Sequence, residues 1–207
     1  MRVGALRLPT AAERLIFSMT ENITPDLRQG LPEALRYLVA EYPRDIWSGH
    51  RNFEGLTRFW LERHVMFRQV LARLEQEAEA MLDGKMEARR YQQQTARLAG
   101  LFLNQLDSHH QVEDQHYFPQ LAALEPPLAR GFEILDADHH LIDGHLTRLA
   151  DTANAMLRAD PLSPLTDVVG ALKHTYERIA PFLNRHLLDE EELVVPVILK
   201  HGPLLHG

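Results

Sequence analysis

The chain has 207 residues, of which 45% are apolar and 25% charged, and its formal net charge at pH 7 is −7. This composition is typical of one folded domain with a packed core, and the acidic balance argues against a general nucleic-acid-binding protein. The chain contains no cysteine, which excludes disulfides, thiolate zinc sites, iron–sulfur clusters and cysteine nucleophiles. A metal would therefore have to be held by histidine, aspartate or glutamate, and 12 histidines are many for this length.

The beginning of the chain shows no sign of a targeting segment. The short apolar run Leu15, Ile16 and Phe17 is preceded by charged residues and broken by a serine, so it is too short for a signal-peptide core. No stretch approaches the ~20 consecutive apolar residues of a membrane span. We therefore expect a soluble, cytoplasmic protein.

Residues 1–45 are predicted to form an N-terminal extension that is partly helical. A short helix is expected over residues 33–41, with Pro32 at its start and Leu35, Leu38 and Val39 on one side. Pro43 follows this segment and favours its end there. No motif in the extension points to a function.

Four long helices are predicted over residues 51–82, 87–117, 128–157 and 165–199. Each has apolar residues at three- and four-residue steps, the period of an amphipathic helix. Gly84 and a series of prolines separate them, and Pro181 should kink the last one. No sustained alternation of apolar and polar residues indicates a strand. We predict an all-α fold, an up-down-up-down four-helix bundle over residues 46–200, followed by a tail over residues 201–207.

One sequence frame occurs twice: a histidine, a glutamate four residues later and a proline ten residues later. The copies are His109, Glu113 and Pro119, and His186, Glu190 and Pro196, which lie 77 residues (186 − 109) further on. Residues i and i+4 share one helix face, so each copy offers an imidazole nitrogen and a carboxylate pointing the same way. Two such helices facing each other would supply the donors of a dinuclear metal site with bridging carboxylates.

The other two long helices also carry a histidine on the apolar stripe, at His64 and His139. The chain thus resembles a duplicated helix pair, each pair giving a histidine and then the histidine–glutamate frame. A single buried histidine, or one histidine–glutamate pair on a helix, is more often structural than a metal ligand. Glu113 and Glu190, however, fall on the apolar stripes, where unpaired carboxylates would cost several kcal/mol. Cations between them would remove that cost.

Residues 47–199 resemble the hemerythrin-like, His-His-Glu cation-binding family. The residues that carry the resemblance are His64 with Phe67 and Leu71; His109 and Glu113 with Tyr117, Phe118 and Pro119; Asp138 and His139 with Ile142; and His186 and Glu190 with Pro196. The resemblance implies a non-haem di-iron centre, for which manganese or zinc are possible substitutes. Its implied metal ligands are His64, His109, Glu113, His139, His186 and Glu190.

One departure from the oxygen-carrying hemerythrins concerns the number of open positions. Those proteins have a second histidine one turn after the first in the third helix, where this chain has Asp143. They also end with an acid that Glu191 could mimic, although Glu190 fits the repeat better. Two histidines, two bridging glutamates and a bridging oxygen would leave one position free on each iron. The resemblance thus implies a protein that binds O2, NO or peroxide in sensing, stress response or iron handling.

Two other classes of function stay open. The same centre could serve a di-iron enzyme, an oxidase, peroxidase or NO reductase, or the metal could only stabilise an interaction protein. The expected partners are a small diatomic ligand or peroxide and a redox partner of unknown identity, without nucleic acid or membrane; a homodimer is possible.

The remaining residues near the frame are expected to play lesser roles. His110 and His140 directly follow predicted ligands, so they should point about 100° away and face outward. Other candidates are His116 and His145 behind the ligands or on the surface, His50 and His174 along an entry path, and Trp60 as a cap over the pocket.

Overall fold

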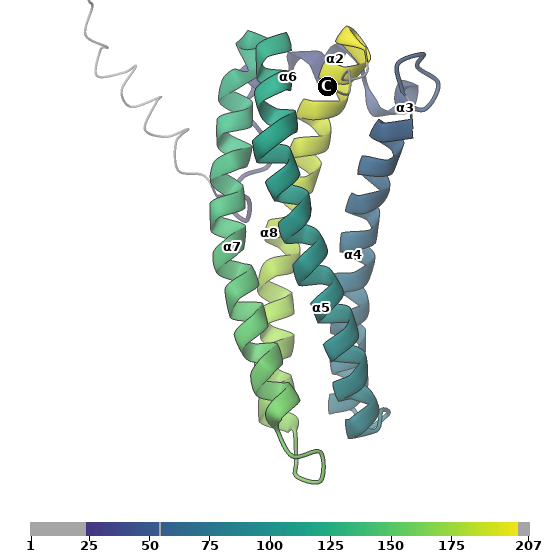
Figure 1. Cartoon of the computed structure of the whole chain (residues 1–207), viewed down its shortest axis with the longest axis vertical. Coiled ribbons are helices and arrows are strands. Elements are labelled where there is room, and N and C mark those ends of the chain that lie inside the picture. Colours follow the sequence, from purple (N-terminus) through teal and green to yellow (C-terminus); the bar gives the residue numbers. More distant parts are fainter. Residues whose placement is uncertain (1–23, 54, 203–207) are drawn as a thin grey trace, which may run out of the picture.

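The computed structural model describes residues 24–53 and 55–202, and this part of the chain is helical without a strand. The predicted all-α class is confirmed. The four long helices are α4 (Gly55–Leu82), α5 (Ala88–Val112), α7 (Ala129–Arg158) and α8 (Thr166–His201). They run side by side along the long axis of the molecule, and the chain reverses direction between successive ones (Figure 1). Their bounds lie close to the predicted ones, and α8 stays helical through Pro181 and Pro196.

The predicted apolar stripes face the interior and form two separate clusters. One fills most of the bundle and includes Phe67, Leu106 and Leu187, all fully buried. The other lies at the end where the N-terminal extension packs, and it includes Leu135 and Leu193. On α4, α7 and α8, and on the path from α5 into α6, the predicted metal ligands lie between residues of the two clusters. The donor side chains are thus enclosed by apolar layers on both sides.

The second long helix differs from the prediction, which let it run unbroken to residue 117. It changes at Val112 into a π-helical turn, η2 (Glu113–Tyr117), and continues as the helix α6 (Phe118–Leu124). The amide of Phe118 donates to the carbonyl of Glu113, five residues back. Pro119 has no amide to donate and its ring crowds the preceding turn, so a wider turn before it lets the helical path continue. The end of this path is at Leu124, followed by η3 (Pro126–Leu128).

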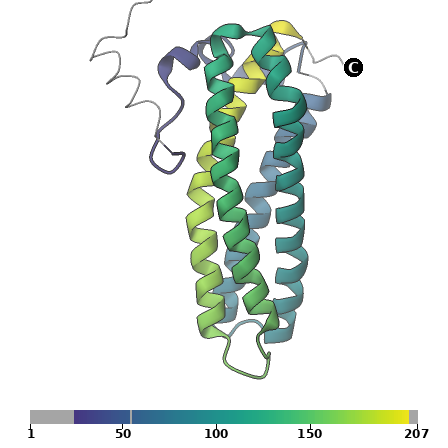
Figure 2. The same cartoon turned by 60° about the vertical axis from the view of Figure 1, so that its left-hand side comes forward.

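The described part of the N-terminal extension, from residue 24 on, packs on the bundle. It contains η1 (Glu33–Leu35) and α2 (Tyr37–Glu41), where a short helix was predicted, and α3 (Arg44–Trp47), which was not. Leu35, Leu38 and Trp47 are buried in the same cluster as Leu193 of α8. Figure 2 shows this purple segment beside the yellow-green α8. The boundary at residue 45 stays a prediction.

None of the helices within residues 24–53 and 55–202 is both long enough and apolar enough to cross a bilayer.

Candidate metal centre

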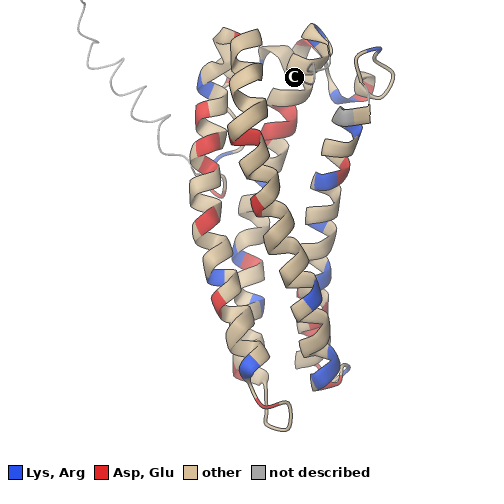
Figure 3. Ribbon diagram, in the orientation of Figure 1, with Lys and Arg blue, Asp and Glu red and all other residues tan. Residues whose placement is uncertain are grey.

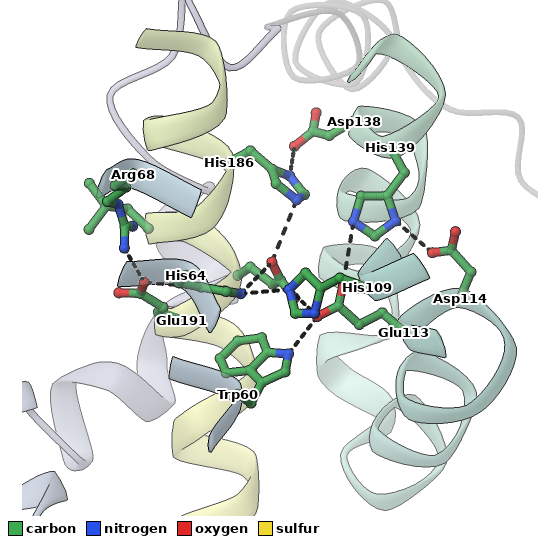
Figure 4. Close-up of polar contacts among 12 residues, drawn as sticks. Trp60, His64, Arg68, His109, Glu113, Asp114, Asp138, His139, His186 and Glu191 are labelled. Carbon is green, nitrogen blue, oxygen red and sulfur yellow. Dashed lines mark hydrogen bonds and ion pairs between the residues drawn. The ribbon is translucent and has the colours of Figure 1, made fainter. Parts of the chain in front are cut away.

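Four helices bring the six predicted ligands into one buried cluster. His64 comes from α4, His109 from α5, His139 from α7, and Glu113 from η2; His186 and Glu190 both come from α8. None of them is more than 9% exposed. Figure 4 shows the four histidine rings and the Glu113 carboxylate approaching one another from opposing helices. The distances between their nitrogen and oxygen atoms indicate whether these side chains could hold a metal.

The donor atoms fall into two groups, each compact enough to surround one ion. We define the first donor group as His64, His109, Glu113 and Glu190, and the second as His110, His139 and His186. Within each group the potential ligand atoms lie within 4.8 Å of one another. His64 Nε2 and His109 Nε2 are 2.9 Å apart. Two nitrogens bound at right angles about 2.1 Å from one ion would be about 3.0 Å apart.

Both glutamates belong to the first donor group and also face a histidine of the second. Glu113 Oε1 is 3.0 Å from His109 Nε2, and Glu113 Oε2 is 3.9 Å from His139 Nε2. Glu190 Oε2 is 3.5 Å from His64 Nε2 and also 3.5 Å from His186 Nε2. A carboxylate that faces donors of both groups is placed to bridge two ions.

Three of the histidines are oriented by a carboxylate behind them. His64 Nδ1 donates to Glu191 Oε1 at 3.0 Å, His139 Nδ1 to Asp114 Oδ1 at 2.7 Å, and His186 Nδ1 to Asp138 Oδ2 at 3.2 Å (Figure 4). A carboxylate can only accept, so the proton sits on Nδ1 and the lone pair of Nε2 points into the cluster. Such carboxylate partners fix the ring and raise the basicity of a metal-binding histidine.

Several buried nitrogens and oxygens that could bind a metal have no hydrogen-bond partner among the described residues. They are both ring nitrogens of His110, Nε2 of His139, Nε2 of His186, Oε2 of Glu113 and both carboxylate oxygens of Glu190. A buried polar atom left without a partner costs about 1–3 kcal/mol. Buried nitrogens and oxygens that lie close together without hydrogen-bond partners are suited to bind a cation.

The protonation states of the cluster also suit a cation. Burial lowers the pKa of His64 and of His186 to about 4, so both rings are neutral at pH 7 and have a lone pair to give. Burial, together with the charge of Glu113, raises the pKa of Glu190 well above its usual range. Two facing carboxylates in a dry layer cannot both ionise without positive charge between them. Figure 3 shows acidic positions in red at about the same height on α8 and on the helical path that continues α5.

Residues 55–198 match a family model described as the hemerythrin HHE cation binding domain. This chain belongs to the hemerythrin family. No curated protein and no solved structure matches it. The matched range contains every residue of both donor groups, and the domain is a cation-binding helical bundle.

Within this hemerythrin domain, the acidic residue directly after each of Glu113 and Glu190 forms a hydrogen bond with a histidine of another helix. Asp114, next to Glu113, supports His139 of α7, and Glu191, next to Glu190, supports His64 of α4. One residue further along a helix turns a side chain by about 100°, from the centre of the bundle to the neighbouring helix. Glu191 is therefore no substitute for Glu190 in the cluster. Its pKa falls to about 2 although burial opposes ionisation, because His64 and two arginines face it.

The prediction for His110 is wrong. Its side chain is buried, 3% exposed, and its ring stacks on that of His139 with centroids 3.9 Å apart. Helix α5 packs against both α4 and α7. His109 and His110 therefore both face the interior, toward different neighbours. The equivalent residue on α7, His140, is exposed as predicted.

The other residues singled out in the sequence lie as follows. His116 and His174 are exposed, His145 packs against Phe182, and His50 accepts from the amide of Asn52. Trp60 is closer to the chemistry than expected, since its indole nitrogen donates to Glu113 Oε1 and its ring lies 4.2 Å from that of His64. Trp60 thus holds the Glu113 carboxylate in place.

A cavity of about 310 Å³ reaches the cluster from one side. Its lining includes Trp60, His109 and Glu113 at the inner end. Phe59 and Val112, which are 58% and 42% exposed, line it where it meets solvent. The remaining lining is largely apolar and comes from α4, α5, α6 and α8. Small molecules therefore have a path to the first donor group.

Proposed function

We propose that this hemerythrin domain binds two iron ions, one at each donor group, and that the loaded protein binds O2, NO or peroxide in sensing, stress response or iron handling. The observation that carries the proposal is the pair of glutamates placed between two buried groups of histidines. Nitrogen and oxygen donors without sulfur favour iron and then manganese among the transition metals, and zinc would also bind.

The position of each side chain indicates its role in holding the two ions. His64, His139 and His186 would bind iron through Nε2, and Glu113 and Glu190 would supply carboxylate oxygens to both donor groups. Glu191, Asp114 and Asp138 keep the rings aligned from behind. The two apolar clusters cover the layer of donor side chains on both sides. Ferrous iron, if held by these side chains, would supply electrons and an open coordination position for a small molecule that enters through the cavity.

The metal content and the anaerobic optical spectrum of protein expressed with added iron test this proposal. We expect two irons per chain and a new absorption band on exposure to air. Glu113→Ala and Glu190→Ala should each lower the iron content, whereas Glu133→Ala, at an exposed position of α7, should not. The proposal is contradicted by protein without iron, or by one tightly held zinc that neither site variant disturbs. Two irons that respond to neither O2 nor NO would point to a structural metal in an interaction protein.

A second candidate is a di-iron enzyme, an oxidase, peroxidase or NO reductase, and the size of the cavity favours an enzyme that also takes an organic substrate. A diatomic molecule needs little more room than a water, whose share of liquid volume is about 30 Å³. A cavity of about 310 Å³ with an apolar lining is within the range of organic ligand pockets. Repeated consumption of O2, peroxide or NO with an added reductant would favour the enzyme. A single stoichiometric reaction would favour binding or sensing.

A further inference from the structure

His110 is a buried histidine without an assigned role. Neither of its ring nitrogens has a hydrogen-bond partner among the described residues, and the side chain is 3% exposed. An imidazole brings one donor and one acceptor, and leaving both unpaired in the interior costs about 1–3 kcal/mol for each. An ordinary apolar residue would fill the same space without that cost. Its presence therefore calls for a ligand that uses the ring nitrogen.

The surroundings of His110 indicate what that ligand is. Its ring contacts two other histidines, His139 at 3.9 Å between centroids and His186 at 5.5 Å. A nitrogen of each of the three lies within 4.8 Å of the others. Nε2 of His139 and Nε2 of His186 are also without a hydrogen-bond partner. Three neighbouring nitrogens without hydrogen-bond partners could occupy one face of an octahedral site.

We propose that His110 is the third histidine ligand of the ion in the second donor group, so that this ion is saturated and only the ion of the first donor group keeps an open position. The inference rests on the proposed two-ion function. Three nitrogens, two glutamate oxygens and a shared solvent oxygen make six donors for the second ion. The first ion, with His64 and His109, has five. The symmetric arrangement expected from the sequence, with one open position on each ion, is thereby replaced by an asymmetric one.

The third histidine comes from α5 and not from α7. Asp143, one turn after His139, is exposed, so that turn of α7 adds no donor. His110 reaches the same ion from the opposite helix, because α5 packs against α7 on the side that His110 faces. A lone pair lies in the plane of its ring, so two rings stacked at 9° must turn out of parallel to share an ion. A rotation of the His110 ring is the rearrangement that binding requires.

The position of the cavity agrees with this asymmetry. Its lining includes His109 and Glu113 of the first donor group. His110, His139 and His186, all within the described residues, are not part of it. An incoming molecule would therefore meet the ion that has a free position, and the saturated ion would lie behind it.

The test compares His110→Phe with His140→Phe in the full chain. Phenylalanine at 110 can keep the stacking on His139 but removes both nitrogens. His140 directly follows the candidate ligand His139, as His110 directly follows His109, but the His140 side chain is 75% exposed. The readouts are the iron content and the number of NO molecules bound per chain by the anaerobic diferrous protein. The thermal midpoint of the metal-free protein shows whether each variant folds.

The expected results are specific to each protein. Wild type and His140→Phe should hold two irons and bind one NO per chain. His110→Phe should hold its second iron about 10- to 100-fold more weakly, or bind a second NO, and its metal-free form should melt no earlier than wild type. Removing an imidazole that is buried without hydrogen bonds relieves its desolvation cost. The variant should therefore be at least as stable as wild type without metal, but bind its second iron more weakly.

Two outcomes overturn the inference in different ways. Wild-type protein with two irons and two bound NO, or a His110→Phe variant with iron content, spectrum and NO binding unchanged, would refute the role of His110 alone. Wild-type protein that takes up fewer than two irons would refute the proposed function and this inference together.

Discussion

At the scale of single residues, the centre depends on which nitrogen of each histidine carries the proton. A neutral imidazole can bind a metal only through its unprotonated nitrogen. The carboxylate of Glu191 keeps the proton of His64 on Nδ1, at 3.0 Å, and Arg68 in turn donates to the same Glu191 oxygen at 2.9 Å. The ring is thereby fixed in both protonation and orientation before any ion arrives.

Replacing that carboxylate should weaken one ion more than the other. Glu191→Ala removes the acceptor for His64 Nδ1, so the ring can turn and its proton can move to Nε2. We expect iron at the first donor group to bind about 10- to 100-fold more weakly. Equilibrium titration of metal-free protein with ferrous iron measures the change.

The control for this prediction is the next residue along α8. Glu192 pairs with Arg36 and Arg44 near the surface and contacts none of the ring nitrogens in the described structure. Glu192→Ala should leave both iron affinities within about twofold of wild type. Equal losses in the two variants would mean that the net charge of this segment matters, and not the hydrogen bond to His64.

At the scale of helices, the centre requires close contact between α7 and α8. Gly131 of α7 lies against Leu193 of α8, and a Cβ at that glycine would come within 2.8 Å of a Leu193 methyl carbon. Leu193 is three residues after Glu190, so the position of this helix pair bears directly on where that carboxylate lies. The absence of a side chain at residue 131 sets the distance between the two backbones.

Two glycine-to-alanine changes on α7 should have opposite effects on stability. An alanine at 131 must push Leu193 or the helix aside, and overpacking of this kind costs about 1–3 kcal/mol, more than the gain in helix propensity. At Gly144 nothing lies within 4 Å of the new Cβ, so Gly144→Ala should stabilise by about 0.5–1 kcal/mol. Urea unfolding of metal-free protein measures both. Stabilisation by Gly131→Ala would show that the two helices yield at this contact.

Periodicity predicted the helices and the inward position of the six candidate ligands, because a buried position and its neighbours at i+3 and i+4 share one face. It failed at His110, since a helix in a bundle buries an arc wide enough for adjacent residues that face two different helices. It also missed the turn at η2, because helices usually end at a proline and the widening that accommodates Pro119 has no period of its own. The partnership of Glu191 with His64 depends on how α4 and α8 align, which no local pattern contains.

At the scale of the whole molecule, the N-terminal extension completes the environment of the centre. Arg28 is buried, and its guanidinium donates to Asp189 at 2.6 Å and forms a bidentate pair with Asp138, which in turn supports His186. Arg44 of α3 reaches Glu191 at 2.7 Å. Positive charge for the carboxylates behind the histidines thus comes partly from outside the helical bundle.

Removing the Arg28 charge should therefore destabilise the protein and not only loosen its beginning. Arg28→Met leaves two buried carboxylates short of a partner, although Asp189 keeps Arg185 at 2.6 Å. Breaking a buried ion pair costs about 3–5 kcal/mol, and we expect about 2–4 kcal/mol here because each carboxylate keeps one contact. Arg36→Met, which removes a pair in which the arginine side chain is 43% exposed, should cost less than about 1 kcal/mol. Chemical denaturation of the two variants measures both changes in the free energy of unfolding. Equal losses of stability would mean that apolar contacts alone hold the extension on the bundle.

A second link between distant segments has a defined pH dependence. Glu125, after α6, accepts from Tyr37 of α2 at 2.6 Å and from Lys200 and His201 at the end of α8 at 2.7 and 2.6 Å. The hydrogen bonds from Lys200 and Tyr37 lower the pKa of Glu125 from 4.5 to about 2. A carboxyl whose pKa is lowered by folding stabilises the protein above its unfolded pKa, and this contribution is lost as the pH falls from about 4.5 toward 2.

Glu125→Gln should therefore lower stability at neutral pH and matter less in acid. We expect a loss of about 1–2 kcal/mol at pH 7, discounted because the Lys200 side chain is 35% exposed, and a shrinking difference from wild type below pH 4.5. Urea unfolding at several pH values between 3.5 and 7 gives the comparison. Glu133→Gln, at a carboxylate that is 63% exposed, should stay within about 0.5 kcal/mol of wild type throughout. A Glu125→Gln difference that stayed constant through pH 3.5 would show that the amide fails by shape and hydrogen bonding, not by loss of the charge that joins α2 to α8.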